Sequence, residues 1–297
     1  MFVNAFSKAS SYTRPVVISH INVKNKCSAG IGSYVIINSE GWAVTAAHIV
    51  KEASKLNEMV DSFHKTQKEK EDIKNNLSID KHTRAKLLKA LPSFKNESPV
   101  RTSVWWGEDG LIVEEIIIVE YVDLAFVKFK NFNPTHINNY PIFKNPNKNI
   151  SPGKSLCRIG FPFATITPTY EEDLDTFILP PGSLPIPFFP NEGIFTRNVN
   201  VKIDPSINKP PYDLMFLETS SPGLKGQSGG PIFDSNGFIW GIQSQTRHFP
   251  LGFSPEVPNG KHGEKEHQFL NIGWGAHIKT IIGAMNDLNI KHEISLD

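Results

Sequence analysis

The stretch Gly226-Gln227-Ser228-Gly229-Gly230-Pro231, followed by the apolar pair Ile232-Phe233, decides how the rest of the chain is interpreted. Glycines allow a tight turn and leave backbone N–H groups uncovered by side chains. Such a turn can expose a hydroxyl while its amides point at one spot, which is the arrangement of a nucleophile beside an oxyanion hole. The same residues also suit an ordinary tight turn between two strands. The choice depends on whether the chain supplies a base and a group that orients it.

The composition limits the classes of partner. The 297 residues suffice for one large core or two medium ones, and 22 prolines and 21 glycines among short β-branched and aromatic runs indicate many strands joined by turns. A formal net charge of +1 gives no global electrostatic reason to bind nucleic acid or an anionic membrane. No apolar run approaches the roughly 20 residues of a membrane span, and residues 1–15 lack the apolar core of a signal peptide. We therefore expect neither nucleic acid nor a membrane as a partner.

The cysteines bear on the compartment. Cys27 and Cys157 are the two cysteines of the chain, too few for a disulfide framework or a zinc site. A single bridge between them stays open at the level of sequence. Their scarcity favours a reducing compartment, so we expect a cytoplasmic protein. No metal or other cofactor is predicted.

Strand and turn signals begin early in the chain. Residues 16–23 form an apolar run typical of a strand, and residues 27–38 lead through two glycines into a second strand. A turn at residues 39–41 and a returning strand at 42–45 complete a hairpin that ends at His48. A histidine where a strand gives way to small residues is poised to face a cleft. A purely structural histidine would fit the same place.

Residues 51–91 change to a helical pattern. Apolar residues recur at spacings of four and three from Ile49 to Phe63, and a second helical stretch runs from about Asp80, which suits an N-cap, to Pro92. The mixed charges favour a solvated helical hairpin over a nucleic-acid patch. Because this segment begins immediately after His48, its base is expected near the rim of any site there. It would act as a lid, as a docking platform for a regulatory protein partner, or as a solvated addition without a role in activity.

Asp123 interrupts an otherwise apolar run at residues 121–129, which predicts a strand. Burying a carboxylate costs several kcal/mol unless it is paired or hydrogen-bonded. Asp123 therefore needs a partner, and either a histidine or the backbone amides of a turn would serve.

The rest of the chain indicates further strands and one irregular segment. Strands are predicted at residues 100–106, 111–119, 154–162, 193–201, 214–219, 231–233, 238–244 and 269–274, and an amphipathic helix at 277–288. Residues 130–153 are an Asn- and Pro-rich connector. The loop 164–192 contains a proline arm at 179–190 that should be extended. This loop is either functional or mobile, or a strap packed over the second half of the fold.

His48, Asp123 and Ser228, taken in this order, resemble the site of the trypsin-like serine peptidases of the chymotrypsin fold. The matching motifs are Thr-Ala-Ala-His at residues 45–48, Val-Asp-Leu-Ala at 122–125 and the serine stretch at 226–231. Residues 32–45, 160–162 and 236–244 look most like the bacterial HtrA-like branch. The resemblance covers roughly residues 16–50, 98–162 and 193–288.

The resemblance implies an all-β fold of two antiparallel six-stranded β-barrels with the active site in the cleft between them. The first barrel would take residues 1–135, with a helical insertion at about 51–91, within 51–95. The second would take residues 136–297, with the proline-rich loop 164–192 and a C-terminal helix. No segment after the barrels is long enough for the peptide-binding PDZ domain that many HtrA-like proteins carry.

The resemblance also assigns roles, which the chemistry of a Ser-His-Asp triad supports. Ser228 would attack the scissile carbonyl, and His48 would accept its proton and return it to the leaving amine. Asp123 would hold the imidazole in the useful tautomer. The amides of Gly226 and Ser228 would form the oxyanion hole. The implied activity is that of a serine endopeptidase acting on proteins or peptides through an acyl-enzyme.

The residue before the serine departs from the secreted digestive branch of the family. That branch has an aspartate there, which pairs with a freshly cut N-terminus, whereas this chain has Gln227. Activation by N-terminal cleavage is therefore not expected, and another contact must hold the turn in shape.

Specificity is predicted from the residues that would line the primary pocket: Pro222, Ser244, Gln245 and Thr246. Pro222 stands where trypsin has its pocket aspartate, so cleavage after Lys or Arg is not expected. The side chain of Thr246 would narrow the pocket. We predict a small or medium uncharged residue before the cut, with an acidic residue as the alternative if Arg247 or His248 takes part.

Two other functions fit the same sequence. A protease-fold module could bind peptides without turnover, although three intact triad residues argue against it. A serine esterase or acyl transferase would use the same triad on a different substrate.

Overall fold

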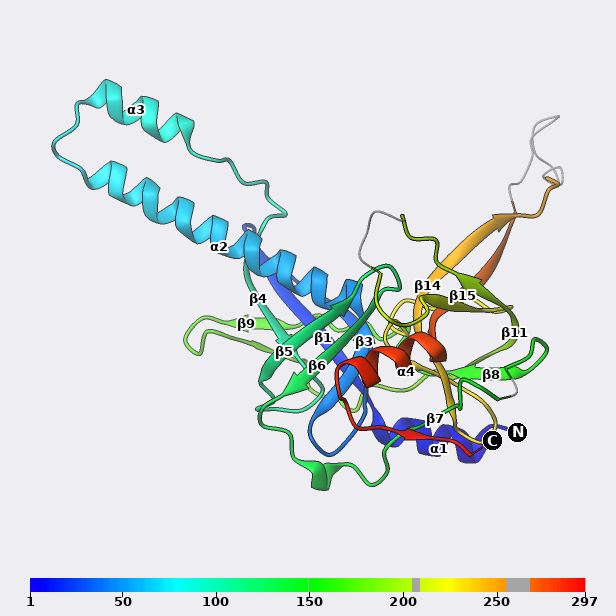
Figure 1. Ribbon diagram of the computed structural model, residues 1–297. Helices are drawn as coiled ribbons and strands as arrows, with labels where there is room; N and C mark the ends of the chain where they lie inside the picture. The colour runs from blue at the N-terminus through cyan, green and yellow to red at the C-terminus, as the bar shows by residue number, and fades with distance from the viewer. Residues whose placement is uncertain (149, 205–208, 255–267, 297) are drawn as a thin grey trace, which may run out of the picture.

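The computed structural model describes residues 1–148, 150–204, 209–254 and 268–296. Two barrel-like β-sheets lie side by side, and a long helical hairpin projects from the first of them (Figure 1). The predicted all-β, chymotrypsin-like class is confirmed, with one sheet closed and the other a half-barrel.

The first sheet has six antiparallel strands in the order β4-β1-β2-β3-β6-β5. In the described part of the chain its outer strands, β4 and β5, do not pair with each other, so this sheet is a half-barrel where a closed barrel was expected. Its strands are β1 (Thr13–Asn22), β2 (Cys27–Ile36), β3 (Trp42–Ala46), β4 (Pro99–Trp105), β5 (Val113–Val119) and β6 (Leu124–Phe129).

The second sheet closes on itself. Its order is β13-β8-β11-β12-β15-β14, and β13 also pairs with β14, which completes a ring of six antiparallel strands. Two short strands, β7 and β16, extend the sheet through parallel pairs, which the antiparallel expectation did not include. The strands are β7 (Ile142–Phe143), β8 (Ser155–Arg158), β11 (Asn191–Asn200), β12 (Met215–Thr219), β13 (Pro231–Phe233), β14 (Ile239–Pro250), β15 (Phe269–His277) and β16 (Glu293–Ile294).

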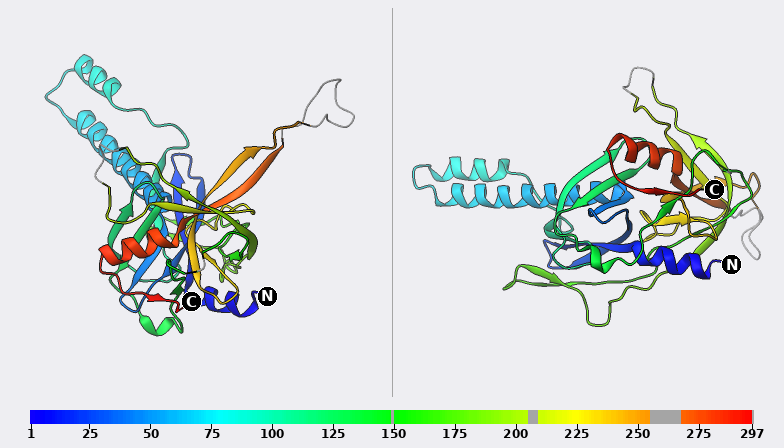
Figure 2. Two further views of the ribbon diagram at one scale, coloured as in Figure 1. Left: turned by 45° about the vertical axis from the view of Figure 1, so that its right-hand side comes forward. Right: turned by 60° about the horizontal axis from the view of Figure 1, so that its bottom comes forward.

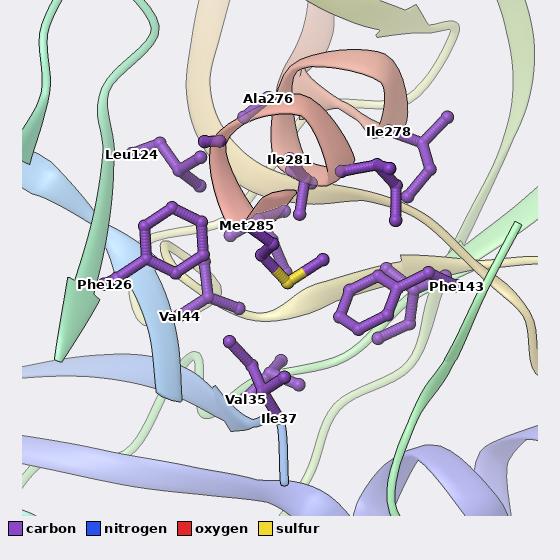
Figure 3. Close-up of a cluster of buried hydrophobic side chains, with 14 of the residues drawn as sticks. Val35, Ile37, Val44, Leu124, Phe126, Phe143, Ala276, Ile278, Ile281 and Met285 are labelled. Atoms are coloured by element: carbon purple, nitrogen blue, oxygen red, sulfur yellow. The ribbon is translucent and has the colours of Figure 1, made fainter. Parts of the chain in front are cut away.

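One hydrophobic core joins the two sheets. Apolar side chains from β2, β3 and β6 pack with side chains of the C-terminal helix α4 (Ile278–Asp287), and Met285 lies at the centre of this group (Figure 3). Val44, Phe126 and Met285 are fully buried. Because burying apolar surface is favourable, this shared core stabilises the packing of the two sheets against each other.

The helical insertion is longer than predicted. Helix α2 (Ala47–Asn75) is continuous across the charged stretch and includes His48 in its first turn, while α3 (Lys81–Ala90) runs back beside it (Figure 1 and Figure 2). Asp80 caps α3 as expected, its carboxylate accepting from the amides of His82 and Thr83. The hairpin extends well away from both sheets.

The N-terminal residues form a helix that was not predicted, α1 (Val3–Tyr12). It packs on the second sheet, where the Phe2 ring meets Phe233 edge-on with the ring centroids 6.2 Å apart. In the described part of the chain no helix is long and apolar enough to cross a membrane. Cys27 and Cys157 are both free thiols, which excludes the bridge that the sequence left open.

The loop 164–192 contains a small hairpin of β9 (Thr169–Glu171) and β10 (Thr176–Ile178) and then the proline arm. Ile166 and Ile186 are buried against Val17 of β1 and Phe161, with Trp105 of β4 beside them. The arm contacts both halves of the fold: Phe188 packs on Phe161 with the ring centroids 4.6 Å apart, and the Phe189 amide donates to the Gly160 carbonyl over 3.0 Å. The predicted strap over the second barrel is therefore present only in part, because apolar residues of the loop also pack on Val17 and Trp105 of the first sheet.

Candidate active site

The serine turn lies between β12 and β13 and requires its glycines. Gly226 has φ +97° and Gly229 has φ +81°, a region that favours glycine. A β-carbon on Gly229 would lie 2.0 Å from the carbonyl oxygen of Ser33, and one on Gly226 would lie 2.5 Å from that of Phe161. No other residue fits at either position without moving the neighbouring backbone.

Ser33 of β2 bonds this turn to the first sheet. Its amide donates to the carbonyl of Ser228 over 2.8 Å, and its hydroxyl donates to the carbonyl of Gly226 over 2.8 Å. Thr45 in turn donates its hydroxyl to the carbonyl of Ser33 over 2.7 Å. At the level of sequence, Ser33 was only part of the hairpin that resembles the HtrA-like branch. No local pattern marks a residue that bonds to a turn almost 200 positions away.

Two amides of the turn carry no hydrogen bond to any part of the chain that the structure describes. The amides beside them are used: Gln227 donates to Leu224 over 2.9 Å, and Gly229 donates to Gln243 over 2.7 Å. Within the described residues, the amides of Gly226 and Ser228 have no protein acceptor. These are the two groups predicted to form the oxyanion hole, and they are free to bind an incoming oxygen.

His48 and Asp123 are directly bonded. The Nδ1 of His48 donates to Oδ2 of Asp123 over 2.8 Å, and the His48 amide donates to Oδ1 over 2.8 Å. The Asp123 carbonyl also accepts from the amide of Ala47 over 3.0 Å. Asp123 therefore caps the N-terminus of α2, whose own N-cap residue is Ala46 and has no capping side chain.

Asp123 lies in the turn before β6, with φ +52°, and the prediction that it interrupts a strand is wrong. The left-handed backbone, which aspartate adopts more readily than most residues, turns both its carboxylate and its carbonyl toward α2. The predicted need for a partner is met by a histidine and by backbone amides together.

The pair shifts the pKa of both groups. The hydrogen bond from Asp123 raises the pKa of His48, against the opposing effect of burial, and the negative charges of Asp123 and Glu52 add to the rise. Burial acts to raise the pKa of Asp123, but the hydrogen bonds and charge of His48 and the hydroxyl of Ser244 lower it overall. The carboxylate is therefore ionised near neutral pH and stabilises a protonated imidazole.

Ser244 connects the pair with the serine. Its hydroxyl donates to Oδ2 of Asp123 over 2.7 Å, and its carbonyl accepts from Oγ of Ser228 over 3.4 Å. The structure thus brings His48, Asp123 and Ser228 together around one residue, which the sequence had assigned only to the primary pocket. Within the described residues Ser228 makes no hydrogen bond to His48, a looser arrangement that is common before substrate binds.

Gln227 supplies the contact that replaces the charged pair of the digestive branch. Its side chain is fully buried, with Oε1 accepting from the Leu224 amide and Nε2 donating to the Phe189 carbonyl, each over 3.0 Å. Phe189 belongs to the proline arm, and its amide donates to the carbonyl of Gly160 over 3.0 Å. The arm therefore holds the serine turn through a neutral amide.

The residues predicted for the primary pocket lie around the start of this turn. Thr246 donates its hydroxyl to the carbonyl of Gly223 over 2.6 Å, which joins β14 to the loop after β12. The carbonyl of Pro222 accepts from Nδ2 of Asn191 over 2.7 Å, and that of Gln245 accepts from the side-chain Nε2 of Gln243 over 3.2 Å. Among the described residues, no group of three His, Cys, Asp or Glu side chains is arranged to hold a metal ion.

The family match covers the residues of this site. A family model described as trypsin-like peptidase domain matches residues 32–242, a span that contains His48, Asp123 and Ser228. The search of curated proteins finds no match. The solved structures found include the HtrA-type protease AlgW with a tripeptide, at 15% identity and a TM-score of 0.46, and a variant of AlgW with a decapeptide, at 13% identity and a TM-score of 0.46. The matches cover 97% of this chain but only 63% and 67% of theirs, so this chain spans less than two thirds of the former.

Proposed function

Because this chain belongs to the family of trypsin-like peptidase domains, we propose that it is a serine endopeptidase that cleaves peptide bonds through an acyl-enzyme. The observation that carries the proposal is the constellation around Ser244, which joins Ser228 to the bonded pair His48 and Asp123. Two uncommitted amides at the same turn complete the set that acyl transfer requires.

In the first half-reaction, Oγ of Ser228 attacks the carbonyl carbon of the scissile bond while Nε2 of His48 takes the hydroxyl proton. The negative charge that develops on the carbonyl oxygen is bound by the amides of Gly226 and Ser228. His48 then gives its proton to the nitrogen of the leaving peptide as the C–N bond breaks. The products of this half-reaction are a free amine and an ester on Ser228.

In the second half-reaction a water molecule takes the place of the amine. His48 removes a proton from the water, the hydroxide attacks the ester carbon, and the same amides bind the oxyanion. The bond to Ser228 breaks, His48 returns the proton to Oγ, and a carboxylic acid leaves. Asp123 holds Nδ1 of His48 throughout, so that Nε2 remains the atom that accepts and returns the proton.

Labelling with a fluorophosphonate probe tests the proposal. An active enzyme is labelled on Ser228, and the label is lost in Ser228→Ala. A peptide-binding module without turnover leaves both proteins unlabelled, which would refute the proposal. Comparison of matched amide and ester substrates then separates a peptidase from an esterase or acyl transferase, because only the peptidase turns over the amide at a useful rate.

We also propose that a partner protein acts on this site through the helical hairpin. The support is that His48 lies in the first turn of α2 and that Asp123 caps this turn. A movement of α2 would therefore change the positions of both residues. The rings of Phe63 and Phe94 close the base of the hairpin, with their centroids 5.2 Å apart. Deleting residues 67–90 beyond this pair removes the outer part alone.

The truncated protein is expected to keep basal cleavage and to lose partner-dependent regulation in cells. N-terminal mapping of cleaved proteins, with Ser228→Ala as the blank, measures both. Unchanged partner binding and an unchanged set of cleaved proteins would leave the hairpin as a solvated addition without a regulatory role.

A further inference from the structure

Arg158, the last residue of β8, carries a buried charge without an acidic partner. Its side chain is 1% exposed. Nη1 donates to the carbonyl of Ser221 over 3.0 Å, and Nη2 donates to the hydroxyl of Thr219. Nε has no partner, and within the described ranges no carboxylate forms an ion pair with this guanidinium.

Burying the charge of Arg158 without an acidic partner is energetically unfavourable. A buried charge loses several kcal/mol of hydration, and proteins normally offset that loss with an opposite charge. Burial lowers the pKa of Arg158 to about 10, so the guanidinium remains protonated at neutral pH. Two neutral acceptors do not balance a full positive charge in this setting, so an anion is the missing partner.

The guanidinium lies beside residues that adjoin the predicted primary pocket. Ser221, which accepts from it, directly precedes Pro222. Gly273 faces it from β15, where it pairs with Thr246 on one side and Thr219 on the other. A β-carbon on Gly273 would lie 2.3 Å from Nη1 of Arg158, so glycine at this position leaves room for the guanidinium between the pocket strands.

Two residues next to the predicted pocket residues also carry buried polar atoms without a partner. Within the described part of the chain, Oγ of Ser221 and Oε1 of Gln243 have no hydrogen-bond partner. The side-chain amide of Gln243 lies against Gly223, the residue after Pro222, and donates to the carbonyls of Gln245 and Trp274. Together with the charge of Arg158, these polar groups do not suit an apolar substrate side chain.

We propose that Arg158 binds the carboxylate of an aspartate or glutamate that precedes the cleaved bond, so that the enzyme cuts after acidic residues. This inference rests on the proposed peptidase function and names its substrate class. It replaces the predicted preference for a small or medium uncharged residue. The alternative of an acidic residue before the cut is kept, but it now depends on Arg158 and not on Arg247 or His248.

Arg247 and His248, the residues to which sequence reasoning tied an acidic preference, are engaged elsewhere. The Arg247 guanidinium lies over the Trp274 ring, 4.8 Å from its centroid, and Nδ1 of His248 bonds to Asn271 over 2.5 Å. Both side chains are exposed on the outer part of β14, whereas Arg158 is buried.

A series of peptidyl diphenyl phosphonates that differ only in the residue before the phosphorus tests the inference. Glutamate or aspartate at that position should label Ser228 at least about tenfold faster than alanine, leucine or lysine. Arg158→Met should lower the rate with the acidic probe by roughly 10²-fold, because a buried carboxylate then loses its partner, and should leave the alanine probe within a few-fold. Arg197→Met is the matched control, because Arg197 is an exposed arginine on β11 that pairs with Glu218. This variant should keep the preference for acidic probes.

The possible outcomes separate the inference from the function on which it rests. Faster labelling by alanine, leucine or lysine overturns the inference and leaves the peptidase function standing. Absence of labelling by every probe refutes the peptidase function and the inference with it. If Arg158→Met does not fold, the preference of the unmodified protein for acidic over neutral probes still decides the question.

Discussion

Replacing Gln227 with methionine should lower kcat with little change in KM. Methionine has almost the same length and volume, but it can neither accept from the Leu224 amide nor donate to the Phe189 carbonyl. Gln227 is fully buried, so water cannot replace either bond without rearrangement. Neither of these two hydrogen bonds goes to residues 244–246 of the predicted pocket, which is why substrate affinity should be nearly unchanged.

The structure sets the size of the effect. Each buried polar group left without a partner costs about 1–3 kcal/mol, and the protein can relieve both costs if residues 224–228 shift. That shift moves the amides of Gly226 and Ser228. Loss of one aligned oxyanion donor typically lowers kcat by roughly 10²- to 10³-fold. We therefore expect a fall in kcat of about 10²-fold, with a loss of about 2 kcal/mol or more in the free energy of unfolding.

Steady-state kinetics on a peptide substrate measures kcat and KM separately, and urea unfolding measures stability. Gln67→Met, the same substitution on the projecting helix α2, is the control and should behave as the unmodified protein. If Gln227→Met kept kcat within twofold while losing the expected stability, the coupling between the proline arm and the oxyanion amides would be refuted.

Three further predictions concern protonation and the arm. Because the pKa of His48 is raised by Asp123, and only the neutral imidazole accepts a proton, kcat/KM should rise with pH through a midpoint above the usual value of about 6.5. Asp123→Asn should move that midpoint to lower pH and reduce kcat by about 10⁴-fold; an unmoved midpoint would contradict the assignment of the base. Burial lowers the pKa of His277 to about 4. Between pH 6.5 and 4 the unfolded state therefore binds a proton at this histidine that the folded state does not bind. The free energy of unfolding should fall by about 3 kcal/mol as the pH drops over this range. In urea-unfolding experiments, His277→Asn should reduce the dependence of the free energy of unfolding on pH. If both proteins showed the same dependence on pH, His277 would be excluded as its cause. Phe188→Ala removes a ring whose centroid lies 4.6 Å from that of Phe161, at an interplanar angle of 34°. It should lower kcat as Gln227→Met does, but by a smaller factor, and an unchanged kcat would show that the arm is held without this ring.

The sequence by itself determined the class of fold and the three residues of the candidate triad. The fold class is confirmed and the triad stays a prediction, and both depend on local chemistry: period-two apolar runs specify strands, and glycines beside a serine specify a turn with exposed amides. His48, Asp123 and Ser228 are each unusual within their own few residues, and the family match now covers all three. The helical hairpin was predicted for the same reason, since its apolar spacing is a local property.

Only the tertiary structure decided which distant groups meet. Asp123 caps α2 from a turn 75 positions away, Ser33 bonds the serine turn to the first sheet, and the carbonyl of Phe189 in the proline arm accepts from the Gln227 side chain. Arg158 looked like an ordinary strand residue, because the absence of a partner is a property of its surroundings and not of its neighbours in the chain. Burial and hydrogen-bond satisfaction arise when remote segments pack, so no local pattern contains them. In this protein they decide how the serine turn is held and which substrate charge its pocket should accept.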